Sequence, residues 1–436
     1  MKKTVILLIM LAIIFSMPLT SFADFTLPEN IKIGLFYSST ALSSCTIACD
    51  GDVIVYYDGA EVGRAPDLNI FTEDGIVKIT SGETLVAECD NKELKFAATE
   101  GFISLNGKKY RGSLQIINLK NGKMTLINKV NMEEYLYSVL PYEMATGWPM
   151  EALKAQAVCA RTYAATSMGR FSQHGFDLTD NTLSQMYGGV SGEKDDCTRA
   201  VDETRGMIVT YNGRPASVFY YASSSGETLD VKDVWGSSYP YLVSVSDEYQ
   251  ASVVKDNAKW TASFTVDEIT QKMNNAGYDL GTITDIEINE LSPQGAVTML
   301  TVKGTKTSAV FQRERARTIF GFRSQVYTVV PQRDNSQTVC VLGADGKASL
   351  TGVTVLASNG KAFSDSVIIR GADDTKTFSF GGETKGFSFT GYGYGHGIGM
   401  SQNGAKGMAN AGFTYDQILT HYFKGTDISA AGGTQE

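Results

Sequence analysis

The chain has 436 residues, and its 38 lysines and arginines against 47 aspartates and glutamates give a formal net charge of −9. This length is enough for two or three domains, and the 43% of hydrophobic residues excludes a disordered chain. An acidic balance argues against a nucleic-acid partner, because phosphate backbones attract basic surfaces. Only three histidines occur, His174, His396 and His421, which constrains any mechanism that needs several imidazoles.

The N-terminal segment predicts export. Two lysines precede an apolar run, and the small-x-small triplet Ser21-Phe22-Ala23 follows it, as in a secretory signal peptide. The run from Thr4 to Met17 would span about 21 Å as a helix, which is short for the roughly 30 Å of bilayer hydrocarbon. We expect residues 1–23 to be a cleaved signal peptide, or alternatively a short anchor. The rest of the chain is then expected to act outside the cytoplasmic membrane.

Residues 24–120 have the pattern of a small all-β module. Short runs of alternating apolar and polar residues recur there, separated by dipeptides that are typical of tight hairpin turns. These dipeptides are Asp58-Gly59, Asp74-Gly75, Asn106-Gly107 and Asn121-Gly122.

Residues 121–428 begin with a predicted helix pair. Asn131, with Glu134 three positions later, indicates the start of a short helix, which should end at Leu140 because Pro141 follows. A second helix is expected from Pro149, with apolar residues recurring on one face.

Strands dominate the rest of this region. A further helix is expected at residues 266–275, an inserted β stretch near residues 335–385, and two short helices at the end, the second capped at Thr414. The predicted class is α+β: a strand-rich region with a helix pair, preceded by the small all-β module.

The six cysteines do not form a metal or redox motif, because no C-x-x-C spacing occurs. Cys45 and Cys49 are the obvious local disulfide pair in an oxidising compartment. Cys159, on the second predicted helix, could act as a nucleophile only with a lowered pKa and a histidine partner. For most of the six, the simplest interpretation is a small buried residue.

Glu143 and Arg161 are the first candidate functional residues. Glu143 lies in the predicted connection between the two helices, where loss of solvent can raise the pKa of a carboxyl group and make it a general acid. A solvated loop glutamate is the simpler alternative. Arg161 lies among small residues on the second helix, where it can pair with an acid or bind an anionic sugar substituent.

Two later stretches suit a polymer ligand. Ser225-Gly226 lies in a serine-rich turn that precedes Trp235, and small hydroxyl groups beside aromatic rings suit a sugar groove, although a turn packed on a core cluster is the simpler interpretation. Glycine then fills every odd position from 391 to 399. In an extended segment this leaves one face bare, so either a polymer-binding cleft or a packed β corner is expected.

Several motif blocks occur in a fixed order along about residues 105–425. They are Tyr110 to Ser113, Glu134 to Leu136, Glu143-Met144, Glu151 to Val158, Ala160 to Thr162, the Asp233 to Gly236 element, Gly395 to Gln402, and His421-Tyr422. In these blocks the chain resembles the SpoIID/LytB family of sporulation proteins and amidase enhancers.

The resemblance implies a peptidoglycan lytic transglycosylase that is secreted or membrane-anchored and acts at the cell wall. Such an enzyme cleaves glycan strands, here expected to be peptide-stripped, between N-acetylmuramic acid and N-acetylglucosamine, leaving 1,6-anhydro ends during sporulation or wall remodelling. The family's catalytic glutamate falls on Glu143. An N-acetylmuramoyl-L-alanine amidase is the further expected partner. The residues expected to bind substrate are Arg161, Ser225, Gly226, Tyr392, His396 and Gln402.

Some members of the family also carry a structural zinc site made from one histidine and two cysteines. Here His174 remains, but Thr179 and Ser184 stand where the cysteines are expected, and neither is a good zinc ligand. We therefore expect no metal and no cofactor.

One carboxyl group is enough for the implied reaction. Most glycosidases use two carboxylates, whereas a lytic transglycosylase uses the C6 hydroxyl of the muramic acid itself as the nucleophile. The leading hypothesis is thus an enzyme that relies on Glu143. A non-catalytic wall-binding protein that enhances an amidase is the second hypothesis, and a cysteine peptidase acting through Cys159 is a distant third.

Overall fold

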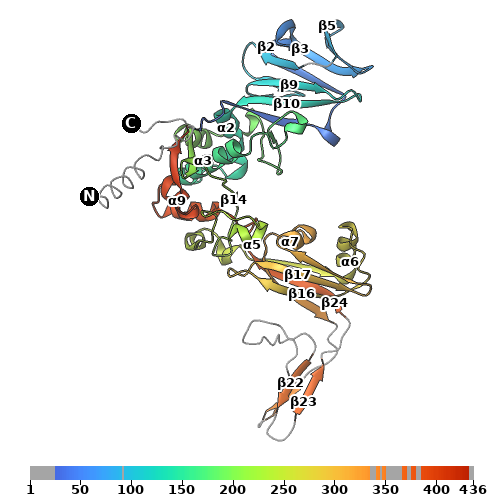
Figure 1. Ribbon diagram of the computed structural model, residues 1–436, viewed down its shortest axis with the longest axis vertical. Helices are drawn as coiled ribbons and strands as arrows, with labels where there is room; N and C mark the ends of the chain where they lie inside the picture. The colour runs from blue at the N-terminus through green and yellow to red at the C-terminus, as the bar shows by residue number, and fades with distance from the viewer. Residues whose placement is uncertain are drawn as a thin grey trace, which may run out of the picture. The chain divides into compact units, whose positions relative to one another are not determined.

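The computed structural model describes residues 25–90, 93–333, 340–343, 346–349, 366–370, 375–379 and 384–431 (Figure 1). The expected signal peptide, residues 1–23, lies outside these ranges. Within them the chain is α+β and rich in strands, as predicted. It forms two compact units: unit 1 runs to Val218 and resumes at Gly425, and unit 2 is Phe219–Lys424.

The chain does not divide near residue 120, where the β module was expected to end. Strand β9 (Ser113–Asn118) pairs antiparallel with β10 (Met124–Asn131), so residues on both sides of position 120 belong to one sheet. The β module and the helix pair therefore share unit 1, and the region expected at residues 121–428 is split after Val218. The pairing of β9 with β10 keeps both sides of residue 120 in one unit, and the amino-acid composition does not reveal this pairing.

The main sheet of unit 1 has the strand order β11-β1-β10-β9-β6-β2-β3-β4-β5, with β7 and β8 branching from β2. Its neighbours pair antiparallel, except for the parallel pair of β1 with β11. The remaining strands are β1 (Asn30–Phe36), β2 (Ser44–Tyr57), β3 (Ala60–Glu73), β4 (Ile76–Ser81), β5 (Thr84–Cys89), β6 (Leu94–Ala98), β7 (Ile103–Leu105), β8 (Lys108–Tyr110) and β11 (Leu178–Thr179).

The predicted turn dipeptides connect these strands. Asp58-Gly59 joins β2 to β3 with φ values of 52° and 81°, the left-handed pair that a two-residue hairpin turn requires. Asp74-Gly75, between β3 and β4, and Asn106-Gly107, between β7 and β8, also have positive φ values at both residues. Local sequence therefore sets these hairpins correctly.

Three helices complete unit 1 beside a small sheet. Helix α2 (Met132–Glu143) lies next to β10 in Figure 1, α3 (Met150–Thr166) packs on α2, and α4 (Asp195–Asp202) packs on both helices. Helix α2 runs past Pro141, where a stop was expected, because the ring falls in the last turn and removes only one backbone hydrogen bond. The small sheet has the order β13-β12-β26, from Arg214–Pro215, Met207–Tyr211 and Asp427–Ala430.

Unit 2 has two three-stranded sheets around an aromatic core. One sheet has the order β15-β24-β19, from Trp260–Thr265, Thr384–Tyr392 and Val326–Arg333; the other has the order β16-β17-β18, from Ile283–Leu291, Val297–Gly304 and Ser308–Gln312. Helix α6 spans Val266–Asn275, as predicted, behind a capping box of Thr265 and Glu268. Helix α7 (Arg315–Phe320) contributes Phe320 to the core, where its ring centroid lies 5.5 Å from that of Phe389.

The inserted β stretch is described only in part. Two hairpins, β20 (Cys340–Gly343) with β21 (Gly346–Ser349) and β22 (Ser366–Arg370) with β23 (Thr375–Ser379), fall within residues 335–385. The other residues of that stretch lie outside the described ranges.

The glycine-rich stretch is a closely packed corner. It follows β24 and leads into β25 (Met400–Ser401), which pairs in parallel with β14 (Tyr220–Tyr221). A Cβ atom at Gly399 would lie 2.3 Å from the carbonyl oxygen of Phe219, and one at Gly395 would lie 2.6 Å from the Cβ of Tyr221. Helices α5 (Val231–Trp235), α8 (Gln402–Asn410) and α9 (Tyr415–Tyr422) surround this corner, and α9 has the predicted capping box of Thr414 and Gln417.

The five cysteines whose side chains are described are free thiols. The expected Cys45–Cys49 disulfide is therefore wrong: both residues lie on β2, and Cys45 is buried in the sheet. Burial raises the pKa of the Cys45 thiol to about 12.

Candidate functional site

Glu143 is the last residue of α2, at the point where the chain leaves the helix for the loop to α3. The helix begins after Asn131, whose side chain accepts a hydrogen bond from the N–H of Glu133 (2.9 Å). It ends with a hydrogen bond from the N–H of Met144 to the carbonyl of Leu140 (2.9 Å). The half-buried Glu143 carboxyl is thus held on a helix end and not on a free loop.

Tyr135, two turns earlier on α2, is a buried phenol whose pKa responds to the charges of Glu143 and of a second carboxyl group. The buried Tyr135 donates a hydrogen bond from its hydroxyl to Oε1 of Gln185 (3.2 Å), and its ring centroid lies 5.2 Å from that of Tyr187. Burial raises the pKa of Tyr135 well above its usual value, and the nearby charges of Glu143 and Asp180 act in the same direction. Both carboxyl groups are therefore electrostatic neighbours of one phenol.

Asp180 is a candidate that sequence reasoning missed. It follows β11, and the N–H of Tyr187 donates a hydrogen bond to its backbone carbonyl (3.1 Å), which closes the loop between them. Burial raises the pKa of the Asp180 carboxyl, against the opposing effect of Lys108. No spacing rule marks this residue, because the pairing of β11 with β1 brings it into this region.

The loop that carries Asp180 packs on α2 through Gly188. The N–H of Gly188 donates to Oγ of Ser138 (2.9 Å), and a Cβ atom at Gly188 would lie 2.2 Å from the hydroxyl of Tyr142. Tyr142 nevertheless leaves half of its surface exposed, and Leu183 and Met186 of the same loop are exposed as well. Apolar side chains that face solvent beside half-buried carboxyl groups are suited to a sugar polymer.

Arg161 does not reach solvent, so the expected contact with substrate is corrected. Its Nε and Nη2 donate to the two carboxylate oxygens of Glu133 on α2, at 2.9 and 2.6 Å. Its guanidinium also donates to the backbone carbonyls of Met207 (3.1 Å) and Val201 (3.2 Å). With an exposed fraction of 0%, Arg161 joins α3 to α2 and is a structural residue.

The residues at the position where some members of the resembled family bind zinc do not fit the metal. Oγ1 of Thr179 donates a hydrogen bond to Oγ of Ser184 (3.1 Å), and His174 contacts the rings of Tyr37 and Phe176. Two hydroxyl groups and one imidazole do not make a zinc site. Across the described ranges, no group of three or more His, Cys, Asp or Glu side chains could hold a metal ion.

Cys159 is fully buried on α3, and burial raises the pKa of its thiol. A nucleophilic cysteine needs the opposite, a lowered pKa and access to substrate. The geometry therefore gives no support to the cysteine peptidase hypothesis.

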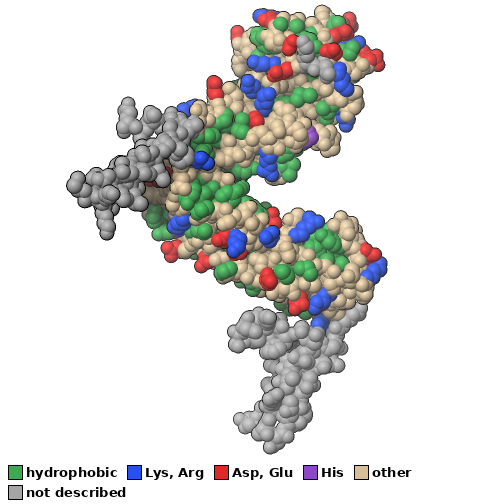
Figure 2. Space-filling view, in the orientation of Figure 1, with side chains coloured by type: hydrophobic (Ala, Val, Ile, Leu, Met, Phe, Trp, Pro, Cys, Tyr) green, Lys and Arg blue, Asp and Glu red, His purple; other side chains and the backbone are tan. Residues whose placement is uncertain are grey.

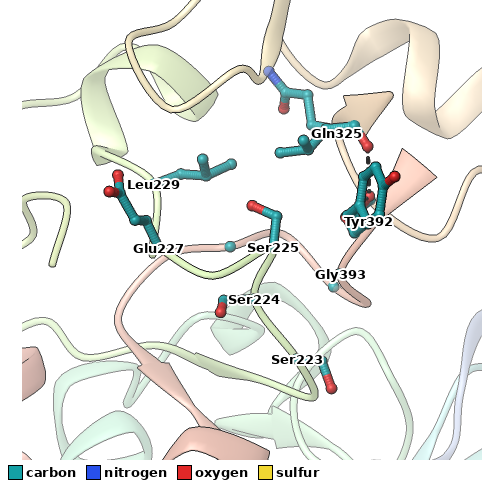
Figure 3. Close-up of a pocket in the computed structure, with 12 residues that line it drawn as sticks. Ser223, Ser224, Ser225, Glu227, Leu229, Gln325, Tyr392 and Gly393 are labelled. Atoms are coloured by element: carbon teal, nitrogen blue, oxygen red, sulfur yellow. Dashed lines mark hydrogen bonds between the residues drawn. The ribbon is translucent and has the colours of Figure 1, made fainter. Parts of the chain in front are cut away.

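Ser225 and Tyr392 line one small pocket of unit 2, with a volume of about 10 Å³ (Figure 3). Figure 3 shows Ser225 between Leu229 and Tyr392, with Gln325 above them. The buried Gln325 donates from Nε2 to the carbonyl of Val297 (2.8 Å), whereas its Oε1 has no hydrogen-bond partner among the described residues. That oxygen is an acceptor the sequence did not single out. Gly226 adjoins the pocket, with a left-handed φ of 115°.

His396 is fixed in one neutral form inside unit 2. Its Nε2–H donates to the carbonyl of Tyr220 (3.0 Å), and its Nδ1 accepts from the N–H of Ile398 (3.0 Å). Burial and the charge of Arg317 lower the pKa of His396 to about 4, against the hydrogen bond to Tyr220. The imidazole is thus held by the protein itself, beside Trp235.

Gln402 begins α8 next to a buried polar network. Its neighbour Ser401 caps the helix by accepting from the N–H of Gly404 (3.1 Å). Asp247 accepts from Oγ of Ser224 (2.6 Å) and from the hydroxyl of Tyr422 (2.5 Å), and burial raises its pKa. This network holds Ser224, which also lines the pocket, in place. Gln402 itself is almost fully buried.

The structure places the candidates in separate units. Glu143 and Arg161 belong to unit 1, whereas Ser225, Gly226, Tyr392, His396 and Gln402 belong to unit 2. On the face of the molecule in Figure 2, acidic and basic side chains are interspersed. No helix among the described residues is long and apolar enough to cross a bilayer.

Comparison with known proteins gives consistent matches. A family model described as a stage II sporulation protein matches residues 120–211, which include Glu143, Arg161 and Asp180. An uncharacterized protein of Brachyspira hyodysenteriae (strain ATCC 49526 / WA1) is 30% identical over 334 residues, which cover 76% of this chain and 75% of that protein. The amidase enhancer of Bacillus subtilis (strain 168) is 30% identical over 76% of this chain but only 46% of its own length. Stage II sporulation protein D of the same strain is 28% identical over 70% of this chain and 76% of its own length.

Proposed function

Because this chain belongs to the SpoIID family, we propose that it is a peptidoglycan lytic transglycosylase in which Glu143 is both the general acid and the general base. The observation that carries the proposal is the place of Glu143, half-buried at the end of α2 within the residues that the family model matches. A helix end fixes a carboxyl group more firmly than a loop does, and general acid catalysis depends on such positioning.

The proposed reaction uses one carboxyl group twice. Protonated Glu143 gives its proton to the glycosidic oxygen as the bond from the muramic C1 breaks. The resulting carboxylate takes the proton of the C6 hydroxyl of the same sugar, whose oxygen attacks C1 and closes the 1,6-anhydro ring. The nucleophile belongs to the substrate, so proximity replaces a bound water molecule and no metal or cofactor is required.

Asp180 has an electrostatic role in this proposal. A glycosidic bond breaks through a transition state with positive charge on the sugar ring, which a nearby carboxylate stabilises. Asp180 shares the surroundings of Tyr135 with Glu143, and its partial burial strengthens any interaction with that charge.

The pocket of unit 2 is proposed to bind sugar units. Ser225 and the free Oε1 of Gln325 offer hydrogen bonds to hydroxyl or amide groups, and Tyr392, 38% exposed, offers a ring face. Gly226 allows close approach of the backbone beside them. His396 and Gln402 support this pocket from inside the unit, because both are held within the packed corner.

The test is digestion of peptide-stripped glycan strands, followed by mass spectrometry of the products. Wild-type protein should release 1,6-anhydromuramic ends, and the Glu143→Gln variant should lose at least about a hundredfold of that activity. Asp180→Asn should lower kcat by about tenfold to a hundredfold and leave KM nearly unchanged. If wild-type protein releases no anhydro ends, or Glu143→Gln releases as many, the proposed reaction is wrong.

The second candidate function is enhancement of an amidase without catalysis, favoured by the 30% identity to a protein named amidase enhancer. It requires binding to the wall and to an N-acetylmuramoyl-L-alanine amidase. Here the measurement is the turnover of a purified amidase on intact sacculi, with wild-type protein or Glu143→Gln added. Equal acceleration by both proteins, with no anhydro products, would establish this function in place of the first.

Either function places the chain outside the cytoplasmic membrane. Peptidoglycan is the proposed substrate or binding surface, and residues 1–23 are proposed to direct export. The choice between sporulation and wall remodelling does not alter the chemistry.

A further inference from the structure

Unit 1 has a cleft that the proposed reaction does not use. Two hollows, of about 280 and 390 Å³, share Lys32 and Gly175 as lining residues. The larger one is also lined by Lys129 of β10 and by the segment after α3 that contains Ser172 and Asp177. Because both hollows are lined by Lys32 of β1 and by Gly175, they lie side by side and together form the cleft.

The cleft brings two lysines directly opposite each other. Lys32 and Lys129 are register partners in the antiparallel pair of β1 with β10, so their side chains leave the same face of the sheet. Both are half-buried, and among the described residues neither side chain has an ion pair or a hydrogen bond. Like charges at opposite positions destabilise a sheet, so an unneutralised pair has a cost that a bound anion would remove.

The acidic groups of the cleft have other partners. The two oxygens of Asp177 accept from the backbone N–H groups of Lys32 (2.9 Å) and Gly169 (3.1 Å). Oε1 of Glu93, in the smaller hollow, accepts from Nε2 of Gln115 (2.6 Å). Neither acid forms an ion pair with the two lysines. The ammonium groups therefore remain available, in a chain whose overall charge is negative.

We propose that Lys32 and Lys129 bind the free carboxylates of a peptide-stripped glycan strand. The proposal rests on the function proposed above, since it takes the same polymer as ligand. When the peptide is removed, each muramic acid exchanges a neutral amide for a lactyl carboxylate, and an ammonium group binds that carboxylate through a charge-assisted hydrogen bond. Ser172 and Asn30, which also line the cleft, can contact sugar hydroxyls.

The experiment measures binding by fluorescence anisotropy with end-labelled, peptide-stripped strands. The full chain carries Glu143→Gln, which prevents cleavage during the measurement. The matched ligand is the same strand with its carboxyl groups converted to methylamides. Free-carboxylate strands should bind at least about tenfold more tightly at low salt, and the difference should shrink at 1 M NaCl, where charges are screened within about 3 Å.

Lys32→Gln/Lys129→Gln should abolish this difference without changing the affinity for the methylamide strands. The control is Lys123→Gln/Lys194→Gln, which removes the same charge from exposed positions of unit 1 and should leave the difference intact. The midpoint temperature of thermal unfolding should be unchanged or slightly higher in Lys32→Gln/Lys129→Gln, because a like-charge pair is removed.

The proposal would be overturned by equal affinity of the parent protein for both strands, by an equal loss in the control variant, or by an equal loss for both ligands in the cleft variant. Poly(glycerol phosphate) is tested in the same assay as an alternative anionic polymer. If the lysines bind it but not the stripped strands, the ligand is a phosphate polymer and the proposal is wrong. The binding assay involves no cleavage, so it can support the lysine site even if the protein releases no anhydro ends. Conversely, release of anhydro ends would support the proposed reaction even if the lysine site fails this test.

Discussion

Arg161 shows how burial can change the meaning of a residue that a motif identifies correctly. The motif places it on the helix after Glu143, and the structure buries its guanidinium against Glu133. A buried pair of this kind adds little net stability when intact, but the loss of one partner leaves an uncompensated charge in the interior. Glu143, by contrast, keeps part of its surface in solvent, as a proton donor to a substrate must.

Arg161→Met should lower the free energy of unfolding by about 3–5 kcal/mol, because Glu133 would remain buried without its partner. The double variant Arg161→Met/Glu133→Gln should recover most of the loss, since the stranded charge is gone and Gly206 keeps its acceptor. Urea unfolding of the three proteins measures both effects. Normal stability of Arg161→Met combined with weaker strand binding would instead support direct contact with substrate.

Elements of this chain were predictable where the signal is local. The Asp58-Gly59, Asp74-Gly75 and Asn106-Gly107 turns, the helix at Val266–Asn275 and the capping box at Thr414 depend on neighbouring residues, and each occurs as expected. Asn121-Gly122 instead lies in a longer connection between β9 and β10, in which Lys120 and Gly122 have positive φ values. The glycine-rich stretch was left open between a cleft and a packed corner, because its meaning depends on what lies against it. Segment 219–229 supplies that partner, and its backbone and side-chain atoms leave no room for side chains at Gly393, Gly395, Gly397 and Gly399.

Gly399→Ala should destabilise unit 2 by at least about 3 kcal/mol, because the new Cβ would lie 2.3 Å from the Phe219 carbonyl at a left-handed φ of 75°. Gly412→Ala is the matched control: its φ is 91°, but nothing lies within 4 Å of the added atom. It should cost only the backbone strain, about 1–2 kcal/mol. Chemical unfolding followed by circular dichroism compares the two, and equal losses would contradict the packing argument.

At the scale of the whole molecule, the chain leaves unit 1 at Val218 and returns to it at Gly425. Strand β26 closes unit 1 by pairing with β12, across more than 200 residues of sequence. The amino-acid composition does not change where the chain leaves unit 1 or where it returns. The boundary expected near residue 120 was placed where strands give way to helices, but both sides of that position belong to the same unit.

The stability of unit 2 should depend on pH through His396. Its pKa is lowered to about 4 in the folded chain, from about 6.5 when unfolded, so the unfolded state binds the proton more readily between these values. The stabilisation is complete above about pH 6.5 and is lost as the pH falls towards 4, with an upper limit of about 3 kcal/mol.

Urea unfolding at pH 7 and pH 4.5, followed by tryptophan fluorescence, tests this dependence. Trp235 and Trp260 both lie in unit 2 and report on it. In His396→Gln the difference between the two pH values should be smaller than in the wild type. An unchanged difference would show that other groups cause the acid sensitivity.

The sequence by itself determined the α+β class, the tight turns, the capped helices and the family blocks that single out Glu143, because these depend on residues close together along the chain. Only the tertiary structure decided that Arg161 is buried, that Asp180 shares the surroundings of Tyr135 with Glu143, and that Lys32 faces Lys129. These relations come from strand register and burial, which join residues far apart in sequence. Hydrophobic periodicity shows that a strand exists, but it does not name the strand that pairs with it.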